Sequence, residues 1–296
     1  MTNGVPATGF RAEAASDSLL HNGLMDPVHN RGGTALPDRF TVIAIGLVAY
    51  SLANLLHEGA GHGGVCVLLG GKPLVLSSVH FECDEGAMSA SGQKMVSAAG
   101  SMVNYLAAAI SLVLMRLMRN RPGPVQYFLW LFTTINLLMA AGYFLFSGLG
   151  NIGDWAAVCN GLVAPVVWRP LLALIGGVLY FLFARRAAIW LRPFAGSDAL
   201  QRQRATRLTM LPYLAGGLLY CVSGFFNPVG PILIAISAAA ASFGGASGLI
   251  WLKEFLRAEN GAATPLVEVP RSIGWILAGI VSAALFIGVL GPAIRF

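Results

Sequence analysis

Charged residues are scarce in this sequence. Only 11% of its 296 residues are charged, whereas 56% are hydrophobic, and the mean hydropathy is +0.70. A soluble protein of this size carries about 25% charged residues. Several apolar runs recur along the chain, each with the length of about 20 residues that crosses a bilayer. The composition therefore excludes an ordinary soluble domain and predicts a polytopic membrane protein with the lipid bilayer as its surroundings.

Nucleic-acid motifs are also missing, although the net charge is +6. The basic residues gather in short segments between apolar runs, mainly at 116–121 and 185–207. Short basic loops of this kind mark the cytoplasmic face of a membrane protein. We expect no nucleic-acid partner, a cytoplasmic N-terminus, and a polar excursion at 70–95 on the opposite side.

Cysteine is rare, and metal-binding cysteine pairs are absent. The four cysteines show no CxxC spacing. We expect them to be unpaired small hydrophobic residues, with a pair between Cys66 and Cys83 as the alternative that stays open. A signal peptide is not expected either, because residues 1–38 are polar and contain no apolar core. This stretch predicts a disordered tail.

The rest of the chain predicts an all-α polytopic membrane protein of about seven transmembrane helices. The expected spans are 40–69, 96–117, 125–148, 168–190, 208–226, 229–252 and 272–293. A short β-element is expected after the first span, as a strand from Val75 to Phe81. The Gly-rich stretch "SGLGNIGDW" predicts a helix-breaking loop, and the apolar piece after it, up to about residue 166, is expected to re-enter rather than cross. We divide the chain into the tail (1–38), a membrane core (39–166), which the motifs described below indicate as the catalytic part, and additional transmembrane helices (167–296).

Ionisable residues within the apolar runs are fewer still. Of 13 acidic residues and five histidines, only Glu58, Asp154, His57 and His62 lie within or at the mouth of the apolar region. A charge inside a bilayer costs several kcal/mol, so such groups pair, bind an ion or move protons. Two imidazoles, one carboxylate ligand and a general base are what a zinc hydrolase needs. A buried ion pair or a proton relay is the alternative.

Three stretches carry a resemblance to a known family, in the same order as in that family. They are "LLHEGAGHGGVCVLLGGKP", "MVSAAGSMVNYLAAAISL" and "YFLFSGLGNIGDWAAV". Together they resemble the site-2 protease family of intramembrane zinc metalloproteases. The resemblance implies a Zn²⁺ ion on His57, His62 and Asp154, with Glu58 as the catalytic base. It also implies that Asn104 holds the substrate backbone or the site geometry; the alternative for Asn104 is a helix–helix hydrogen bond.

The sequence departs from the family pattern in its spacing. The family motif is HExxH, whereas this chain has HExxxH, and positions five apart on an α-helix point about 140° away from each other. One extra residue in the turn realigns them, so the spacing predicts a π-turn or local unwinding within Gly59–Gly61. Ser101 stands where the family usually has proline, and Trp155 follows Asp154 where glycine is usual.

The expected function is that of a zinc metalloendopeptidase, a hydrolase that cuts transmembrane or membrane-associated substrates in a bacterial cell membrane. A catalytically inactive relative that binds membrane proteins, and a transporter or proton-relay protein, are the alternatives. His80 is a further candidate ligand or gate, whereas Asn136 and Asn151 are expected to be structural. Bacterial relatives place the metal site nearer the cytoplasm, which conflicts with the basic loops, and the oligomeric state stays open.

Overall fold

A computed structural model describes residues 36–86, 88–162, 164–230, 237–256 and 266–296. The predicted disordered tail, residues 1–38, therefore lies almost entirely outside the described residues. The described chain is mostly helical and includes one small sheet.

Six helices of the described chain are long and apolar enough to cross a membrane. They are the continuous helix Arg39–Leu68, made of α1 (Arg39–Leu55), η1 (Leu56–Gly63) and α2 (Gly64–Leu68), then α3 (Ala90–Leu117), α4 (Gly123–Gly150), α6 (Pro165–Ala195), α7 (Gln201–Phe225), and α10 (Ile273–Leu285) continued by η4 (Phe286–Leu290). Six of the seven predicted spans correspond to these helices, and most boundaries agree within a few residues.

The seventh predicted span, 229–252, is wrong as a continuous helix in its described part. That part contains the short elements η2 (Ala240–Gly244), α9 (Gly248–Trp251) and η3 (Leu252–Phe255). The segment is rich in glycine, which favours helix poorly. The hydroxyl of Tyr180 lies 2.9 Å from the carbonyl oxygen of Gly245 and accepts a hydrogen bond from the Gly248 amide at 2.7 Å. This side chain satisfies backbone groups that an unbroken helix would satisfy itself.

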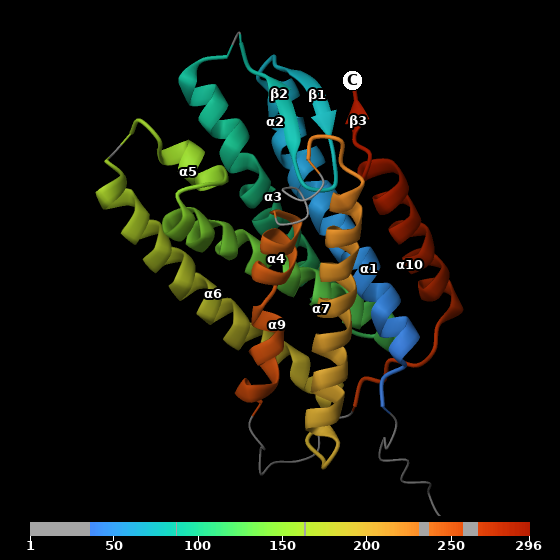
Figure 1. The fold of residues 1–296 in the computed structure, drawn as a ribbon. Coiled ribbons are helices and arrows are strands. Elements are labelled where there is room, and N and C mark those ends of the chain that lie inside the picture. The colour runs from blue at the N-terminus through green and yellow to red at the C-terminus, as the bar shows by residue number, and fades with distance from the viewer. Residues whose placement is uncertain (1–35, 87, 163, 231–236, 257–265) are drawn as a thin grey trace, which may run out of the picture. The chain divides into compact units, whose positions relative to one another are not determined.

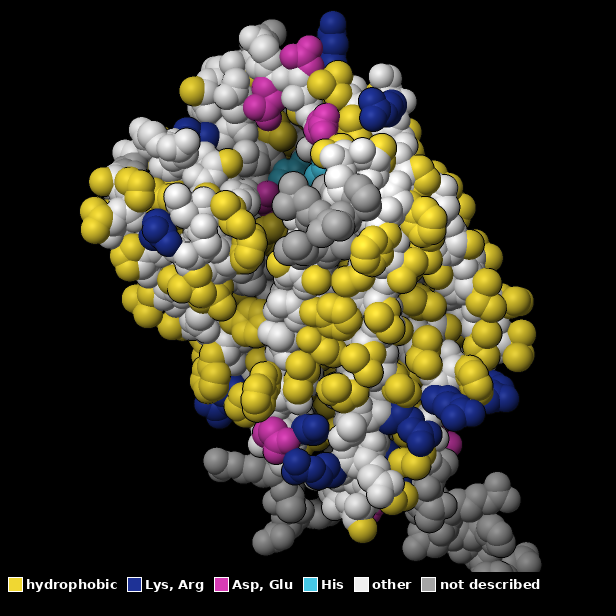
Figure 2. Space-filling model, in the orientation of Figure 1, with side chains coloured by type: hydrophobic (Ala, Val, Ile, Leu, Met, Phe, Trp, Pro, Cys, Tyr) yellow, Lys and Arg dark blue, Asp and Glu magenta, His cyan; other side chains and the backbone are white. Residues whose placement is uncertain are grey.

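Helix α4 lies at the centre of the packed helices and contacts α3, α6 and α1 (Figure 1). Its middle is buried on all sides, and two of its aromatic side chains form hydrogen bonds with the backbone of neighbouring helices. Tyr127 donates a hydrogen bond to the Leu208 carbonyl at 2.6 Å, and the Trp130 indole donates one to the Ala187 carbonyl at 3.0 Å. By contrast, α6 and α10 are mostly exposed, and Figure 2 shows hydrophobic side chains over much of the visible face.

The polar excursion forms a β-hairpin of β1 (Lys72–Leu76) and β2 (Phe81–Asp84). The β-element is therefore confirmed, but the single strand predicted from Val75 to Phe81 is wrong, because a turn divides it. The Ser77 hydroxyl makes this turn by accepting hydrogen bonds from the amides of Val79 and His80. A third strand, β3 (Ile294–Arg295), pairs antiparallel with β1 and was not predicted.

A disulfide joins Cys66 of α2 to Cys83 of β2. The expectation of four unpaired cysteines is therefore wrong for this pair, whereas Cys159 and Cys221 are free thiols as expected. The hairpin folds back over the end of α2 and brings the two sulfur atoms together. Gly71 allows this approach, since a Cβ atom there would lie within 3 Å of both sulfur atoms.

The predicted helix-breaking loop follows α4. Asn151 adopts a left-handed conformation with φ of 57°, Gly153 has φ of 86°, and the short helix α5 (Asp154–Cys159) begins directly afterwards. Arg169, near the start of α6, donates hydrogen bonds to the carbonyls of Gly148 and Leu149 at the end of α4. The end of α4 and the start of α6 therefore lie side by side, and α5, with six residues, is too short to cross a membrane.

Candidate metal centre

The HExxxH stretch forms a π-helix from Leu56 to Gly63, continuous with the α-helices on both sides. This confirms the π-turn that the spacing predicts. The wider turn brings His57 and His62 to the same face, with their ring centres 4.8 Å apart and their Nε2 atoms 3.2 Å apart. Residues five apart thus meet in the way that residues four apart meet on an α-helix.

Two glycines bring this π-helix against α3. A Cβ atom on Gly61 would lie 2.7 Å from the Cα atom of Gly100, so the two backbones touch here. A Cβ atom on Gly100 would lie 2.5 Å from His62 Nε2 and 2.6 Å from His57 Nε2. Both imidazoles occupy the space that a larger residue on α3 would fill.

Helix α3 also fixes the tautomer of both imidazoles. His57 Nδ1 lies 2.6 Å from the side-chain oxygen of Asn104, and His62 Nδ1 lies 2.7 Å from the Val96 carbonyl oxygen. Asn104 presents its oxygen because its amide nitrogen donates to Asn136 at 2.6 Å and toward Ala53 at 3.4 Å. Carbonyl and amide oxygens only accept, so each Nδ1 carries a proton, and in the neutral imidazole this leaves Nε2 as the nitrogen with the lone pair that can bind a metal.

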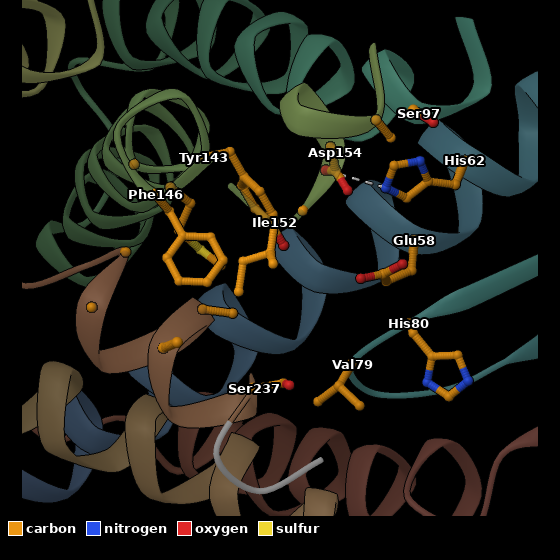
Figure 3. A pocket seen from close by; sticks show the side chains of 18 of the residues that line it. Glu58, His62, Val79, His80, Ser97, Tyr143, Phe146, Ile152, Asp154 and Ser237 are labelled. Carbon is orange, nitrogen blue, oxygen red and sulfur yellow. Dashed lines mark ion pairs between the residues drawn. The ribbon is translucent and has the colours of Figure 1, made fainter. Parts of the chain in front are cut away.

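Asp154 completes the cluster from the first turn of α5. Its Oδ2 atom lies 3.2 Å from His57 Nε2 and 3.5 Å from His62 Nε2. Figure 3 shows the second of these contacts as a dashed line. This oxygen is buried and has no hydrogen-bond partner of good geometry among the described residues. Burial acts to raise the pKa of Asp154, but hydrogen bonds and charge from the two imidazoles in their protonated form outweigh it and hold this pKa below its ordinary value.

The spacing of these three atoms fits a metal ion. Each residue offers one ligand atom, and these atoms lie within 4.8 Å of one another. Two atoms bound at about 2.0–2.1 Å to a tetrahedral zinc ion are roughly 3.3 Å apart. The observed separations of 3.2, 3.2 and 3.5 Å match that value.

Contacts from α3 hold α5, and thereby Asp154, in place. The ammonium group of Lys94 donates to the last carbonyls of α5, at 2.8 Å for Val158 and at 3.4 Å for Ala157, and also to the Asn160 carbonyl. The Trp155 indole donates to the Ser101 hydroxyl at 3.2 Å. Ser101 and Trp155 are two of the departures from the family pattern, and they contact each other.

A cavity of about 680 Å³ opens beside the cluster. Glu58 and His62 line one side, and the hairpin contributes Val79 and His80 (Figure 3). Helix α3 contributes Ser97, and most of the rest of the wall comes from the end of α4, the loop before α5 and the residues in and around η2. Its members include Tyr143, Phe146, Ile152, Ser237 and Gly245. The Glu58 side chain points into this space near Asp154 and His62 (Figure 3).

The structure also shows where the other candidate residues lie. Asn104 is fully buried and contacts His57, and it is not among the residues that line the cavity. His80 lines the cavity but is bonded to Ser77 and Glu82 and is not one of the three clustered ligands. Asn151 caps α4 in a left-handed conformation, in keeping with its expected structural place.

Sequence reasoning missed three side chains around the cluster. Tyr143 stacks on His57 with ring centres 4.5 Å apart, and Lys94 holds α5. Asn136 was expected to be structural, yet it orients Asn104 and therefore belongs to the chain of contacts that reaches His57. No local pattern marks these residues. The one available indication was their position: each is a polar or charged residue within or at the end of an apolar run, in a helix other than the one that carries the histidines.

Comparisons with family models, curated proteins and solved structures found no match to this chain. The resemblance to site-2 proteases therefore rests on the three quoted stretches alone. The geometry of the cluster stands independently of that resemblance, because it follows from the described residues themselves.

Proposed function

We propose that this chain is an intramembrane zinc metalloprotease that hydrolyses peptide bonds of transmembrane or membrane-associated polypeptides. One observation carries the proposal. The Nε2 atoms of His57 and His62 face each other at 3.2 Å while both Nδ1 atoms are bonded to oxygen acceptors. If both imidazoles are neutral, two Nε2 lone pairs and a buried carboxylate face one another, and this arrangement is unfavourable unless a metal ion or a proton lies between them.

Two imidazole nitrogens and one carboxylate oxygen are a ligand set that suits zinc. Catalytic zinc sites have three protein ligands and leave a fourth position open. Here the cavity beside His62 supplies space on the open side. The hydrogen bonds from Nδ1 to Asn104 and Val96 are the outer contacts that orient metal-binding histidines in such sites.

When bound, zinc would supply a Lewis acid that polarises a peptide carbonyl and acidifies water. In the proposed mechanism the Glu58 carboxylate takes a proton from the attacking water and later delivers it to the leaving amine. Its place in the cavity beside His62 suits this role. Asn104 is a positioning residue, since it holds His57 and is itself fully buried.

An extended chain segment is the substrate form that this site favours, because a helical backbone hides its carbonyls in hydrogen bonds. Strand β2 pairs with β1 along one edge, and Phe81 and Cys83 of β2 line the cavity. A substrate could add to its other edge as a further strand. The bilayer around six apolar helices then supplies membrane-anchored substrates, and a bacterial cell membrane is part of this proposal.

Metal content of the purified protein tests the proposal directly. We expect about one zinc ion per chain, lost in His57→Ala and in His62→Ala, because each removes one of three ligands. His80→Ala is the matched control, since His80 is a described histidine outside the cluster, and it should keep the metal. Unchanged zinc content in both ligand variants would refute the metal assignment and favour a proton-relay protein.

A zinc-loaded protein that cuts no membrane polypeptide would instead be a binding protein without catalytic activity. Reconstituted wild-type protein should therefore be mixed with single-span polypeptides that contain a helix-breaking segment. The appearance of two fragments, suppressed by a zinc chelator and restored by zinc, is the expected outcome.

A further inference from the structure

The two ends of the helices differ in charge. We name the end that carries the hairpin 72–84 the hairpin end, and the end where α1 and α7 begin the basic end (Figure 1). The described lysines and arginines of the hairpin end are Lys72, Lys94, Arg169 and Arg295. Those of the basic end are Arg39, Arg116, Arg119, Arg121, Arg185, Arg186, Arg192, Arg202, Arg204, Arg207, Lys253 and Arg271. Figure 2 shows basic side chains gathered at the basic end, below the apolar surface.

Contacts between elements confirm that the basic residues share one end. Arg202 at the start of α7 pairs with Glu254 of η3 at 2.9 Å, and Arg271 before α10 pairs with Asp38 before α1 at 3.1 Å. Short basic segments next to membrane spans are retained on the cytoplasmic side. The charge distribution therefore favours a cytoplasmic basic end.

The disulfide gives an independent indication of orientation. Cys66 and Cys83 are joined at the hairpin end, between α2 and β2. Disulfides persist in oxidising compartments such as the bacterial periplasm or the cell surface, and are rare in the reducing cytoplasm. The hairpin end therefore suits the oxidising side, which agrees with a cytoplasmic basic end.

The metal cluster lies near the hairpin end. His62 is six residues before Leu68, where the first span ends, which corresponds to roughly 9 Å along a helix at about 1.5 Å per residue. Arg39, at the basic end, is 23 residues away, or roughly 35 Å by the same measure. The cavity beside the cluster is lined by His80, Cys83 and Glu85 of the hairpin region. Figure 2 shows histidine side chains at the bottom of a hollow between acidic residues near this end.

We propose that the candidate metal site opens to the exoplasmic side of the membrane, so that polypeptide segments reach it only from that side. The substrate class is then the exoplasmic flank or exoplasmic half of a membrane-anchored chain. The assignment of a substrate rests on the proposed function, whereas the direction in which the cavity opens does not. The disulfide lies beside this opening. Cys83 lines the cavity, and its bond to Cys66 joins β2 to the helix that carries His57 and His62.

Three single-cysteine variants test the proposal in a Cys159→Ser/Cys221→Ser background that keeps the disulfide. Lys72→Cys lies on the exposed hairpin, Asn120→Cys lies on the exposed loop after α3, and Ser97→Cys lines the cavity. Intact cells are treated with a small, charged, membrane-impermeant methanethiosulfonate reagent. We expect Lys72→Cys and Ser97→Cys to react in intact cells, and Asn120→Cys to react only after the membrane is opened.

Two outcomes would overturn the proposal. Reaction of Asn120→Cys but not Lys72→Cys in intact cells would reverse the orientation. Reaction of Lys72→Cys in intact cells, with Ser97→Cys reacting only in opened cells, would mean that the cavity opens toward the cytoplasm. Labelling requires neither zinc nor cleavage, so a metal-free protein would refute the proposed function while the labelling pattern still decides the orientation.

Discussion

Glu58 is the one acidic side chain of the first span, and its two histidine neighbours in the motif both turn toward Asp154. Its own side chain points instead into the cavity (Figure 3). If Glu58 only formed a buried ion pair with a histidine, its carboxylate would be expected to face that imidazole. The arrangement therefore separates the three proposed ligands, which face one another, from the proposed base, which faces the cavity.

Replacing Glu58 by glutamine should separate metal binding from catalysis. Glu58→Gln keeps the size of the side chain but removes the group that accepts a proton, and the three clustered ligands stay in place. We expect zinc content to equal that of the wild type and cleavage to fall by at least about 10²-fold, the usual effect of losing a general base. Cleavage at the wild-type rate, measured on the same single-span polypeptide, would show that the mechanism is wrong.

Gly100 offers a second test at the level of one residue. A Cβ atom there would lie within 2.6 Å of both imidazole Nε2 atoms, so Gly100→Ala must push the rings apart. Gly64→Ala is the matched control, because it lies one residue beyond the same π-helix and a Cβ atom there meets nothing within 4 Å. We expect zinc to be lost or bound much more weakly in Gly100→Ala and unchanged in Gly64→Ala, as measured by competition with a zinc chelator. Equal affinities in the two variants would contradict the close approach of α3 to the two imidazoles.

Helix α5 shows how a short element can be held by a long one. With six residues it has too few internal hydrogen bonds to be stable alone. Lys94 bonds its C-terminal carbonyls, where a positive charge is favourable, and Trp155 bonds Ser101. The direction of the Asp154 carboxylate therefore depends on side chains of α3.

Removing the Lys94 contacts should make the position of α5, and thereby of Asp154, less well defined without changing Asp154 itself. In Lys94→Met we expect zinc affinity to fall roughly tenfold to hundredfold, the range found when outer contacts of a metal site are lost. Lys72→Met is the control, because Lys72 is an exposed lysine of β1 that makes none of these contacts with α5. An unchanged zinc affinity in Lys94→Met, measured by the same chelator competition, would mean that α5 is positioned by other contacts.

At the scale of the whole molecule, the disulfide joins the hairpin covalently to the first apolar helix. It closes a loop between residues 17 positions apart. A loop of this length contributes about 3 kcal/mol through the restricted unfolded chain. We expect Cys83→Ser to lower the thermal unfolding midpoint in detergent and Cys159→Ser, which removes a free thiol, to leave it nearly unchanged. Denatured wild-type protein should react with a thiol reagent at Cys159 and Cys221 only, and at all four cysteines after reduction. Four reactive thiols before reduction would contradict the disulfide.

Much of this architecture could be predicted because it follows from local properties of the chain. A run of apolar residues predicts a span wherever it occurs, and an ionisable residue within such a run is rare enough to indicate a site. The π-turn followed from helix geometry alone, since His57 and His62 are five residues apart and glycines lie between them. The loop before Asp154 followed from its glycines in the same way.

The amino-acid sequence by itself thus determined the mostly helical class, six helices that are long and apolar enough to span a membrane, the π-turn and the small set of ionisable residues within the apolar runs. Tertiary structure decided which partners those residues meet: Asn104 and Val96 behind the histidines, Lys94 and Ser101 behind α5, and Cys83 opposite Cys66. It also decided that the segment expected as a seventh helix is broken, with Tyr180 bonded to its backbone. The physical reason is that these contacts join residues far apart in the chain. Their formation depends on how closely helices approach, as Gly61 and Gly100 do, and that approach leaves no periodic pattern in the sequence.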